Sequence, residues 1–140
     1  MRVVESGGVR ARWDPGRRLL ALHMRPGCAP TASDADVIAD AVESWTGLDA
    51  PIDAIVDCEG ATGAFVGWRV RLNTRIRRTG RKVRLGYHNL RGLNRLVIPA
   101  FANMSGIEAR FFRNSREAEA WLAGVEDASM SFQETVRKPS

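Results

Sequence analysis

Residues 52–58 read Ile-Asp-Ala-Ile-Val-Asp-Cys, a short and mostly apolar run. Such a run predicts a central strand that is covered on both of its faces. A tight loop follows at residues 59–63 (Glu-Gly-Ala-Thr-Gly), and a helix is predicted over residues 64–78. Its apolar side chains recur at helical spacing and form one buried stripe: Phe65, Trp68, Leu72 and Ile76. The strand, loop and helix together are typical of an α/β domain.

Strands and helices alternate upstream of this unit as well. Residues 8–14 and 18–25 alternate apolar and polar side chains on either side of an Asp-Pro-Gly turn, which predicts a hairpin. A helix is then predicted between Thr31 and Gly47, because apolar residues recur there at helical spacing. Its expected buried face is Val37, Ile38, Ala41, Val42 and Trp45.

The alternation continues downstream. Residues 82–88 predict a strand, and residues 90–104 predict a helix that bends or restarts at Pro99, since proline cannot donate the interior hydrogen bond. Residues 107–112 predict a last strand, and a capping-box pattern starting at Asn114 predicts a final helix. The order of elements predicts an α/β fold with a mixed, mainly parallel sheet of about five strands packed with about four helices.

Length and composition indicate one ordinary domain. The 140 residues are 44% hydrophobic and 26% charged, enough to bury a core without metal or disulfide support. We expect a single domain over residues 1–126 and a loosely ordered tail over residues 127–140. No apolar run approaches the length of a membrane span, and residues 1–5 lack the apolar stretch of a signal peptide, so we expect a cytoplasmic protein. Cys28 and Cys58 show no metal-ligand spacing, which is typical of reduced thiols.

The positive charge is concentrated in one segment. Between Arg69 and Arg84 there are eight basic residues and no acidic one, within a chain of net charge +5. On the predicted helix, Arg71, Arg75 and Arg78 form an outward basic face that can attract phosphate, anionic lipid or an acidic protein. The chain shows no nucleic-acid-binding module or aromatic stacking platform, so we do not expect a nucleic acid partner. A solvated helix face is the simpler interpretation.

Six polar or glycine residues lie at or just beyond the predicted ends of two strands: Asp57, Glu59, Gly60, Gly63, His88 and Asn89. In open α/β sheets this edge is where ligands bind, so we expect a ligand or partner there. Asp57 and Glu59 with His88 have the chemistry for metal binding or acid–base work. A single histidine from a separate loop is weak support, so no metal site and no catalytic residue are predicted. His23, in the hairpin, is interpreted as structural.

Residues 111–122 read Phe-Phe-Arg-Asn-Ser-Arg-Glu-Ala-Glu-Ala-Trp-Leu. They resemble the closing strand and helix of the SpoIIAA-like family, bacterial relatives of the STAS (anti-sigma-factor antagonist) domain. The order of elements over residues 9–122 is similar to that family as well. In STAS antagonists, a serine of an Asp-Ser-Ser-Gly stretch after the central strand is phosphorylated by a partner kinase. Here the stretch at residues 60–63 is Gly-Ala-Thr-Gly, so the resemblance places Thr62 at the phospho-acceptor position, without the aspartate.

Three functions follow as hypotheses. The resemblance implies a non-enzymatic regulatory domain, phospho-switched at Thr62, that docks an acidic partner protein and needs no cofactor. The alternative is a small-ligand or lipid carrier, with an apolar cavity between helices and sheet near Phe65, Phe101 and Met104. An enzyme using Asp57, Glu59 and His88 is the third. Because small α/β domains often pair through a helix or an edge strand, we also expect a homodimer.

Overall fold

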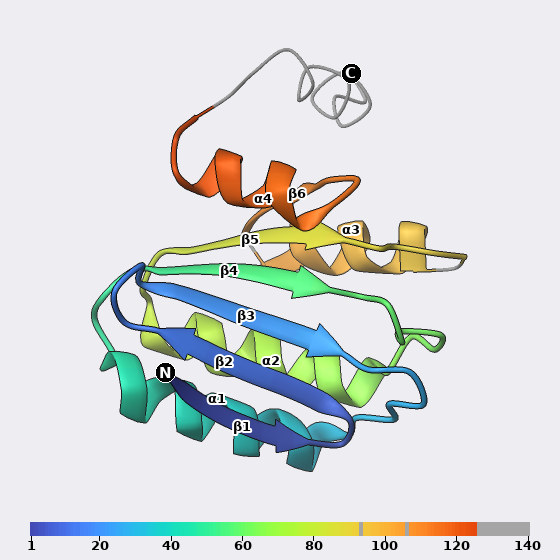
Figure 1. Ribbon diagram of the computed structural model, residues 1–140. Coiled ribbons are helices and arrows are strands. Elements are labelled where there is room, and N and C mark those ends of the chain that lie inside the picture. The colour runs from blue at the N-terminus through green and yellow to red at the C-terminus, as the bar shows by residue number, and fades with distance from the viewer. Residues whose placement is uncertain (93, 106, 126–140) are drawn as a thin grey trace.

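In the described part of the chain, six strands form one sheet, and four helices pack against its two faces (Figure 1). The computed structural model describes residues 1–92, 94–105 and 107–125, with residues 101–105 described by their backbone alone. The predicted tail at residues 127–140 lies outside this part of the chain. In chain order the elements are β1 (Arg2–Ser6), β2 (Val9–Asp14), β3 (Leu19–Met24), α1 (Ala32–Thr46), β4 (Ile52–Asp57), α2 (Val66–Thr79), β5 (Val83–His88), α3 (Asn94–Ser105), β6 (Glu108–Phe111) and α4 (Ser115–Leu122).

The sheet is mixed and mainly parallel, as predicted. Its strands lie in the order β1-β2-β3-β4-β5-β6; the two pairings within β1–β3 are antiparallel, and the three from β3 to β6 are parallel. The sixth strand is β1, which the sequence analysis does not predict. It is an edge strand whose five residues are mostly exposed, so it lacks the apolar alternation that marks a half-buried strand.

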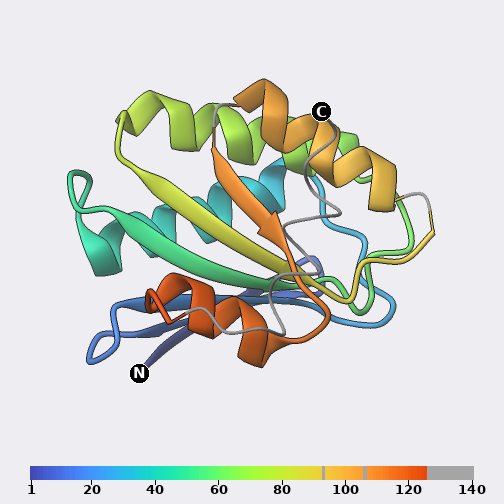
Figure 2. The same ribbon diagram turned by 90° about the horizontal axis from the view of Figure 1, so that it is seen from above.

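Three helices cover one face of the sheet and the fourth covers the other. Strand order advances in one direction from β3 to β6, so right-handed crossovers place α1, α2 and α3 on the same face. Figure 2 shows these three helices together and α4 on the opposite side. There α4 packs on β4 and β5, where a Cβ added to Gly86 would lie only 3.0 Å from the Cβ of Ala118.

The larger core lies between the sheet and the face that α1 and α2 present to it. Alternate residues of the strands point into it, including Leu22, Val56 and Leu85. The buried residues of α1 are Ala35, Ile38, Ala39 and Val42. The predicted face of this helix is therefore partly wrong: Val37 is 44% exposed, because the helix is rotated toward its alanines.

Two further expectations concern helices. The buried stripe of α2 is confirmed, with Trp68 buried and Phe65, Leu72 and Ile76 packed against the core. The third helix continues through Pro99 rather than restarting there. Among the helices in the described ranges, none combines the length and the apolar character that crossing a bilayer demands.

Candidate functional site

The loops that follow β3, β4 and β5 meet at one edge of the sheet, called here the carboxyl edge. The amide of Gly60 donates a hydrogen bond of 2.7 Å to the carbonyl of Met24, and the Cys28 thiol donates one of 3.3 Å to the Gly60 carbonyl. Asn94, buried at the start of α3, donates from Nδ2 to the carbonyl oxygens of Ala61 and Gly63. The predicted glycine loop is therefore held by its backbone groups from both sides.

Asp57 organises the polar residues on this edge. Its Oδ1 accepts hydrogen bonds from the Glu59 amide at 3.0 Å and from Nδ2 of Asn89 at 2.8 Å. Asn89 adopts a left-handed backbone conformation with φ of 62°, which a short polar side chain tolerates. The structure thus brings Asp57, Glu59 and Asn89 together, as their positions after two neighbouring parallel strands predict.

His23 joins this group although it was interpreted as structural. It pairs in register with Asp57 across β3 and β4, and its Nε2 lies 2.8 Å from Oε1 of Glu59 and 3.7 Å from Oδ2 of Asp57. One ligand atom from each of the three residues lies within 4.8 Å of the others. We name His23, Asp57 and Glu59 the edge cluster.

His88 lies beside the edge cluster on the same face of the sheet. It pairs in register with Asp57 across β4 and β5, and it is only 7% exposed. Within the described ranges no group hydrogen-bonds to its imidazole. Burial lowers the pKa of His88, the charge of Asp57 opposes this change, and His23 adds to it. A buried imidazole therefore lies next to Asp57 in the sheet, and no described residue uses its hydrogen-bonding capacity.

Thr62 lies in the loop before α2 and is exposed. Its amide donates to the Gly60 carbonyl at 2.9 Å, but α2 begins only at Val66, after Phe65 in a left-handed conformation. Thr62 is therefore not the N-cap of α2, because the first free N–H groups of the helix lie further along the chain. Its place as a phospho-acceptor stays a prediction.

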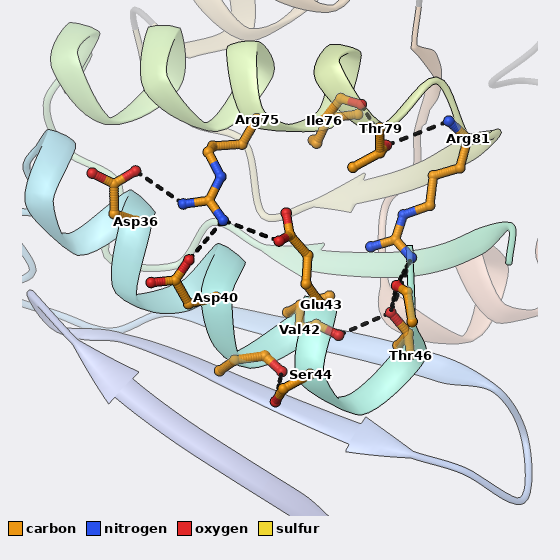
Figure 3. A network of polar contacts seen from close by, with 12 residues as sticks. Asp36, Asp40, Val42, Glu43, Ser44, Thr46, Arg75, Ile76, Thr79 and Arg81 are labelled. Atoms are coloured by element: carbon orange, nitrogen blue, oxygen red, sulfur yellow. Dashed lines mark hydrogen bonds and ion pairs between the residues drawn. The ribbon is translucent and has the colours of Figure 1, made fainter. Parts of the chain in front are cut away.

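The predicted basic face is largely neutralised by α1 (Figure 3). Arg75 is directed toward α1, its side chain only 17% exposed, and it contacts Asp36 at 3.2 Å, Asp40 at 2.7 Å and Glu43 at 3.1 Å. Arg71 also pairs with Asp36, at 2.6 Å. The expectation that Arg75 points outward is wrong, because acidic residues on the neighbouring helix attract it inward. Arg78, by contrast, is exposed as predicted.

Arg69 is the one basic residue of this segment that lies in the core. It is 7% exposed, and it donates from Nε to the Ala64 carbonyl at 2.7 Å and from Nη2 to Oδ1 of Asn94 at 3.5 Å. Ion pairs between described residues do not include Arg69. Its position was predictable in principle, because residue 69 falls four after Phe65 and three before Leu72, on the buried stripe.

The groups nearest to Arg69 do not neutralise its charge. Burial lowers the pKa of Arg69, but a guanidinium still keeps its proton at neutral pH. Burial raises the pKa of the Cys58 thiol to about 12, and it also raises the pKa values of Cys28 and of the Tyr87 phenol. All three neighbours are therefore uncharged at pH 7, and no acidic group among the described residues pairs with the buried guanidinium.

Arg69 and Tyr87 line a cavity between α1, α2 and the sheet, which we name the Arg69 cavity. Its volume is about 100 Å³, and most of its lining is apolar, with Leu22, Val56 and Trp68 among the contributors. A cavity in this place was the requirement of the carrier hypothesis. Its expected landmarks differ, because Phe65 does not line it and the side chains of Phe101 and Met104 lie outside the described part of the structure.

Comparisons of the chain with protein-family models, with curated proteins and with solved structures find no match. Function must therefore be inferred from the chemistry of the Arg69 cavity and of the edge cluster themselves.

Proposed function

We propose that this domain is a binding protein for a small carboxylic acid with an apolar body, held in the Arg69 cavity with its carboxylate on Arg69. One observation carries the proposal: a buried guanidinium with no carboxylate partner among the described residues forms the wall of an apolar cavity. A buried charge without a partner lowers stability, and a bound anion of opposite charge removes that cost.

The donors around Arg69 match a carboxylate. A guanidinium offers parallel N–H groups in the geometry of two carboxylate oxygens. Arg69 uses Nε and Nη2 within the chain, and no hydrogen bond of Nη1 to a described residue is found. The Tyr87 hydroxyl likewise has no hydrogen-bond partner in the described ranges, and its raised pKa keeps it a donor. Two unused donors thus border the same cavity.

The cavity limits the size of the apolar body. An engineered apolar cavity of about 150 Å³ accommodates benzene. At about 100 Å³, the Arg69 cavity is smaller than that one, so it suits a branched body of about four carbon atoms, admits a benzene ring only if its lining side chains move slightly, and does not enclose a long acyl chain. The carrier hypothesis is therefore proposed here for compact aromatic or branched acids rather than for lipids.

Benzoate is the probe that tests this proposal. We expect isothermal titration calorimetry on untagged protein to show one benzoate per chain, with weaker binding of benzyl alcohol, which lacks the charge, and of acetate, which lacks the body. Arg69→Met should weaken benzoate binding by about 10- to 100-fold, since a hydrogen-bonded charge contributes about 1.5–3 kcal/mol. Arg78→Met, on the exposed side of the same helix, is the matched control and should bind as the wild type does.

Two results would overturn the proposal. One is the absence of any measurable benzoate binding or benzoate-induced rise in melting temperature by the wild-type protein. The other is equal benzoate affinity of wild type and folded Arg69→Met, which would show that the guanidinium does not hold the carboxylate.

A second candidate is the phospho-switched interaction domain implied by the resemblance to STAS antagonists. What supports it is the exposure of Thr62 in the loop on the carboxyl edge, where a kinase has access. With Arg71 and Arg75 paired to α1, docking of an acidic partner would depend on Arg78. Mass spectrometry of Thr62-containing peptides from protein purified from its own host tests the switch. Unphosphorylated Thr62 in all growth phases would contradict the switch. Size-exclusion chromatography of the same sample tests the expected homodimer.

A further inference from the structure

We propose that the edge cluster, His23, Asp57 and Glu59, binds a divalent transition-metal ion of the Zn²⁺ type, with the buried His88 beside it as a further nitrogen donor. This site lies on the opposite face of the sheet from the Arg69 cavity. Val56 lines that cavity, and side chains alternate along a strand, so Asp57 points to the other face. The proposal is therefore independent of carboxylate binding.

The donor atoms of the edge cluster lie close to the spacing of a metal site. Nε2 of His23 is 2.8 Å from Oε1 of Glu59 and 3.7 Å from Oδ2 of Asp57. Neighbouring ligands of a tetrahedral ion bound at about 2.0–2.1 Å lie about 3.4 Å apart. Small side-chain rotations would bring all three atoms to that spacing, since they already lie within 4.8 Å of one another.

Asp57 is fixed by its other oxygen. Oδ1 accepts from the Glu59 amide and from Asn89, whereas Oδ2 is the atom closer to His23 and receives no hydrogen bond from a described donor. Metal ligands are characteristically held in this way, because hydrogen bonds to the non-coordinating atom set their orientation. The edge cluster therefore has a positioning contact as well as donors.

His88 supplies an independent observation. A histidine that is 7% exposed ordinarily finds a hydrogen-bond partner, yet no described residue provides one. Its register with Asp57 places the imidazole on the same face as the edge cluster. A metal ion there would use a donor that the protein itself leaves unused.

The donor set selects the class of ion. Imidazole nitrogens with carboxylates suit Zn²⁺ and its first-row neighbours, whereas Mg²⁺ and Ca²⁺ prefer sites made only of oxygen. A simple hydrogen bond between His23 and Glu59 is the competing explanation of the geometry. It predicts no metal affinity and no involvement of His88.

Titration of the untagged, EDTA-treated protein with ZnCl₂ tests the site. We expect one Zn²⁺ per chain by calorimetry, no comparable binding of Mg²⁺, and intense visible absorption when Co²⁺ replaces Zn²⁺. Glu59→Gln, on an exposed loop, and His23→Ala should each weaken Zn²⁺ binding by at least 10-fold, and Asn89→Ala by about 10- to 100-fold through Asp57. Asp49→Asn, an exposed carboxylate before β4, is the matched control and should bind Zn²⁺ like the wild type.

Histidine ring spectra give a readout that does not depend on any variant. We expect the ring nitrogen resonances of His23 and of His88 to shift together when Zn²⁺ is added to wild-type protein labelled with ¹⁵N. Zn²⁺ affinity unchanged in Glu59→Gln and in His23→Ala would overturn the site. A shift of His23 without His88 would overturn the assignment of His88 as a donor.

Discussion

The carbonyl oxygen of Arg25 lies so close to Gly60 that a Cβ on Gly60 would stand 1.9 Å from it. The Gly60 amide also donates to the carbonyl of Met24, the last residue of β3, at 2.7 Å. The loops after β3 and β4 are thus in direct backbone contact. That contact brings His23 within reach of Glu59, which is 36 residues away in the sequence.

The first prediction concerns this contact. Gly60→Ala should lower the free energy of unfolding by about 3 kcal/mol, because the added methyl group forces two backbone segments apart. Gly67→Ala is the matched control, since its Cβ would meet nothing closer than the Ala32 amide nitrogen at 3.8 Å. In helix α2 that change should raise stability by about 0.5–1 kcal/mol. Urea unfolding measures both, and equal effects of the two substitutions would contradict the packing seen here.

The second prediction concerns Arg75. Arg75→Ala should lower the free energy of unfolding by about 1–2 kcal/mol, because it leaves Asp36, Asp40 and Glu43 close together on α1 without their shared cation. The expected loss of stability is modest because the Asp40 side chain is largely exposed, so solvent screens its charge. Arg78→Ala should change stability by less than about 0.5 kcal/mol. Chemical unfolding at low salt and at 1 M NaCl tests the electrostatic origin of this effect. The loss of free energy of unfolding caused by Arg75→Ala should be smaller at high salt. A loss that does not change with salt would indicate lost packing instead.

Much of the fold follows from the sequence because its strands and helices carry clear periodic patterns. The apolar run of β4 and the helical spacing of α2 predict a covered central strand and a crossover helix, and both are present. The edge strand β1 has no such pattern. It pairs with a neighbouring strand on one side only and is little buried, so its side chains need not be apolar at alternate positions. The face of α1 is harder to predict than its existence, because alanine packs closely on the sheet and weighs little in an apolar pattern.

The site is less predictable because it depends on strand order. Asp57, Glu59 and Asn89 follow two strands that any parallel sheet places side by side, so their meeting could be predicted. The part played by His23 could not, since it requires the second hairpin strand to pair with β4 rather than lie at an edge. The burial of Arg69 could not be predicted from its residue type, because an arginine in a basic run is ordinarily exposed to solvent. Only its spacing from Phe65 and Leu72 indicates burial.

The third prediction follows from the buried charge of Arg69, which forms no ion pair with a described residue. Without ligand, Arg69→Met should unfold at the same or a higher denaturant concentration than the wild type, because methionine fills the space without a buried charge. The lost hydrogen bond to Ala64 limits the gain to about 1 kcal/mol. With benzoate at a concentration that saturates the wild type the order should reverse, since the wild type gains more binding energy than the weaker-binding variant. A loss of about 2 kcal/mol or more in the ligand-free variant would show that Arg69 has a partner that stabilises it.

The fourth prediction concerns Asp34, which links β1 to the start of α1. Its Oδ1 accepts from Ser6 at 2.6 Å and its Oδ2 from the Thr31 amide at 2.8 Å, and these hydrogen bonds lower its pKa below the ordinary value of 3.8. As the pH falls, the Asp34 carboxylate is therefore protonated in the unfolded chain before it is protonated in the folded chain. Its contribution to the free energy of unfolding is complete above pH 3.8 and is lost as the pH falls through the pKa that Asp34 has in the folded protein. Asp34→Asn should cost about 1 kcal/mol at pH 7, typical of a helix cap, and progressively less in acid. Urea unfolding of both proteins between pH 2.5 and 7 measures the difference, and a gap that stays constant with pH would mean that the carboxylate charge plays no part.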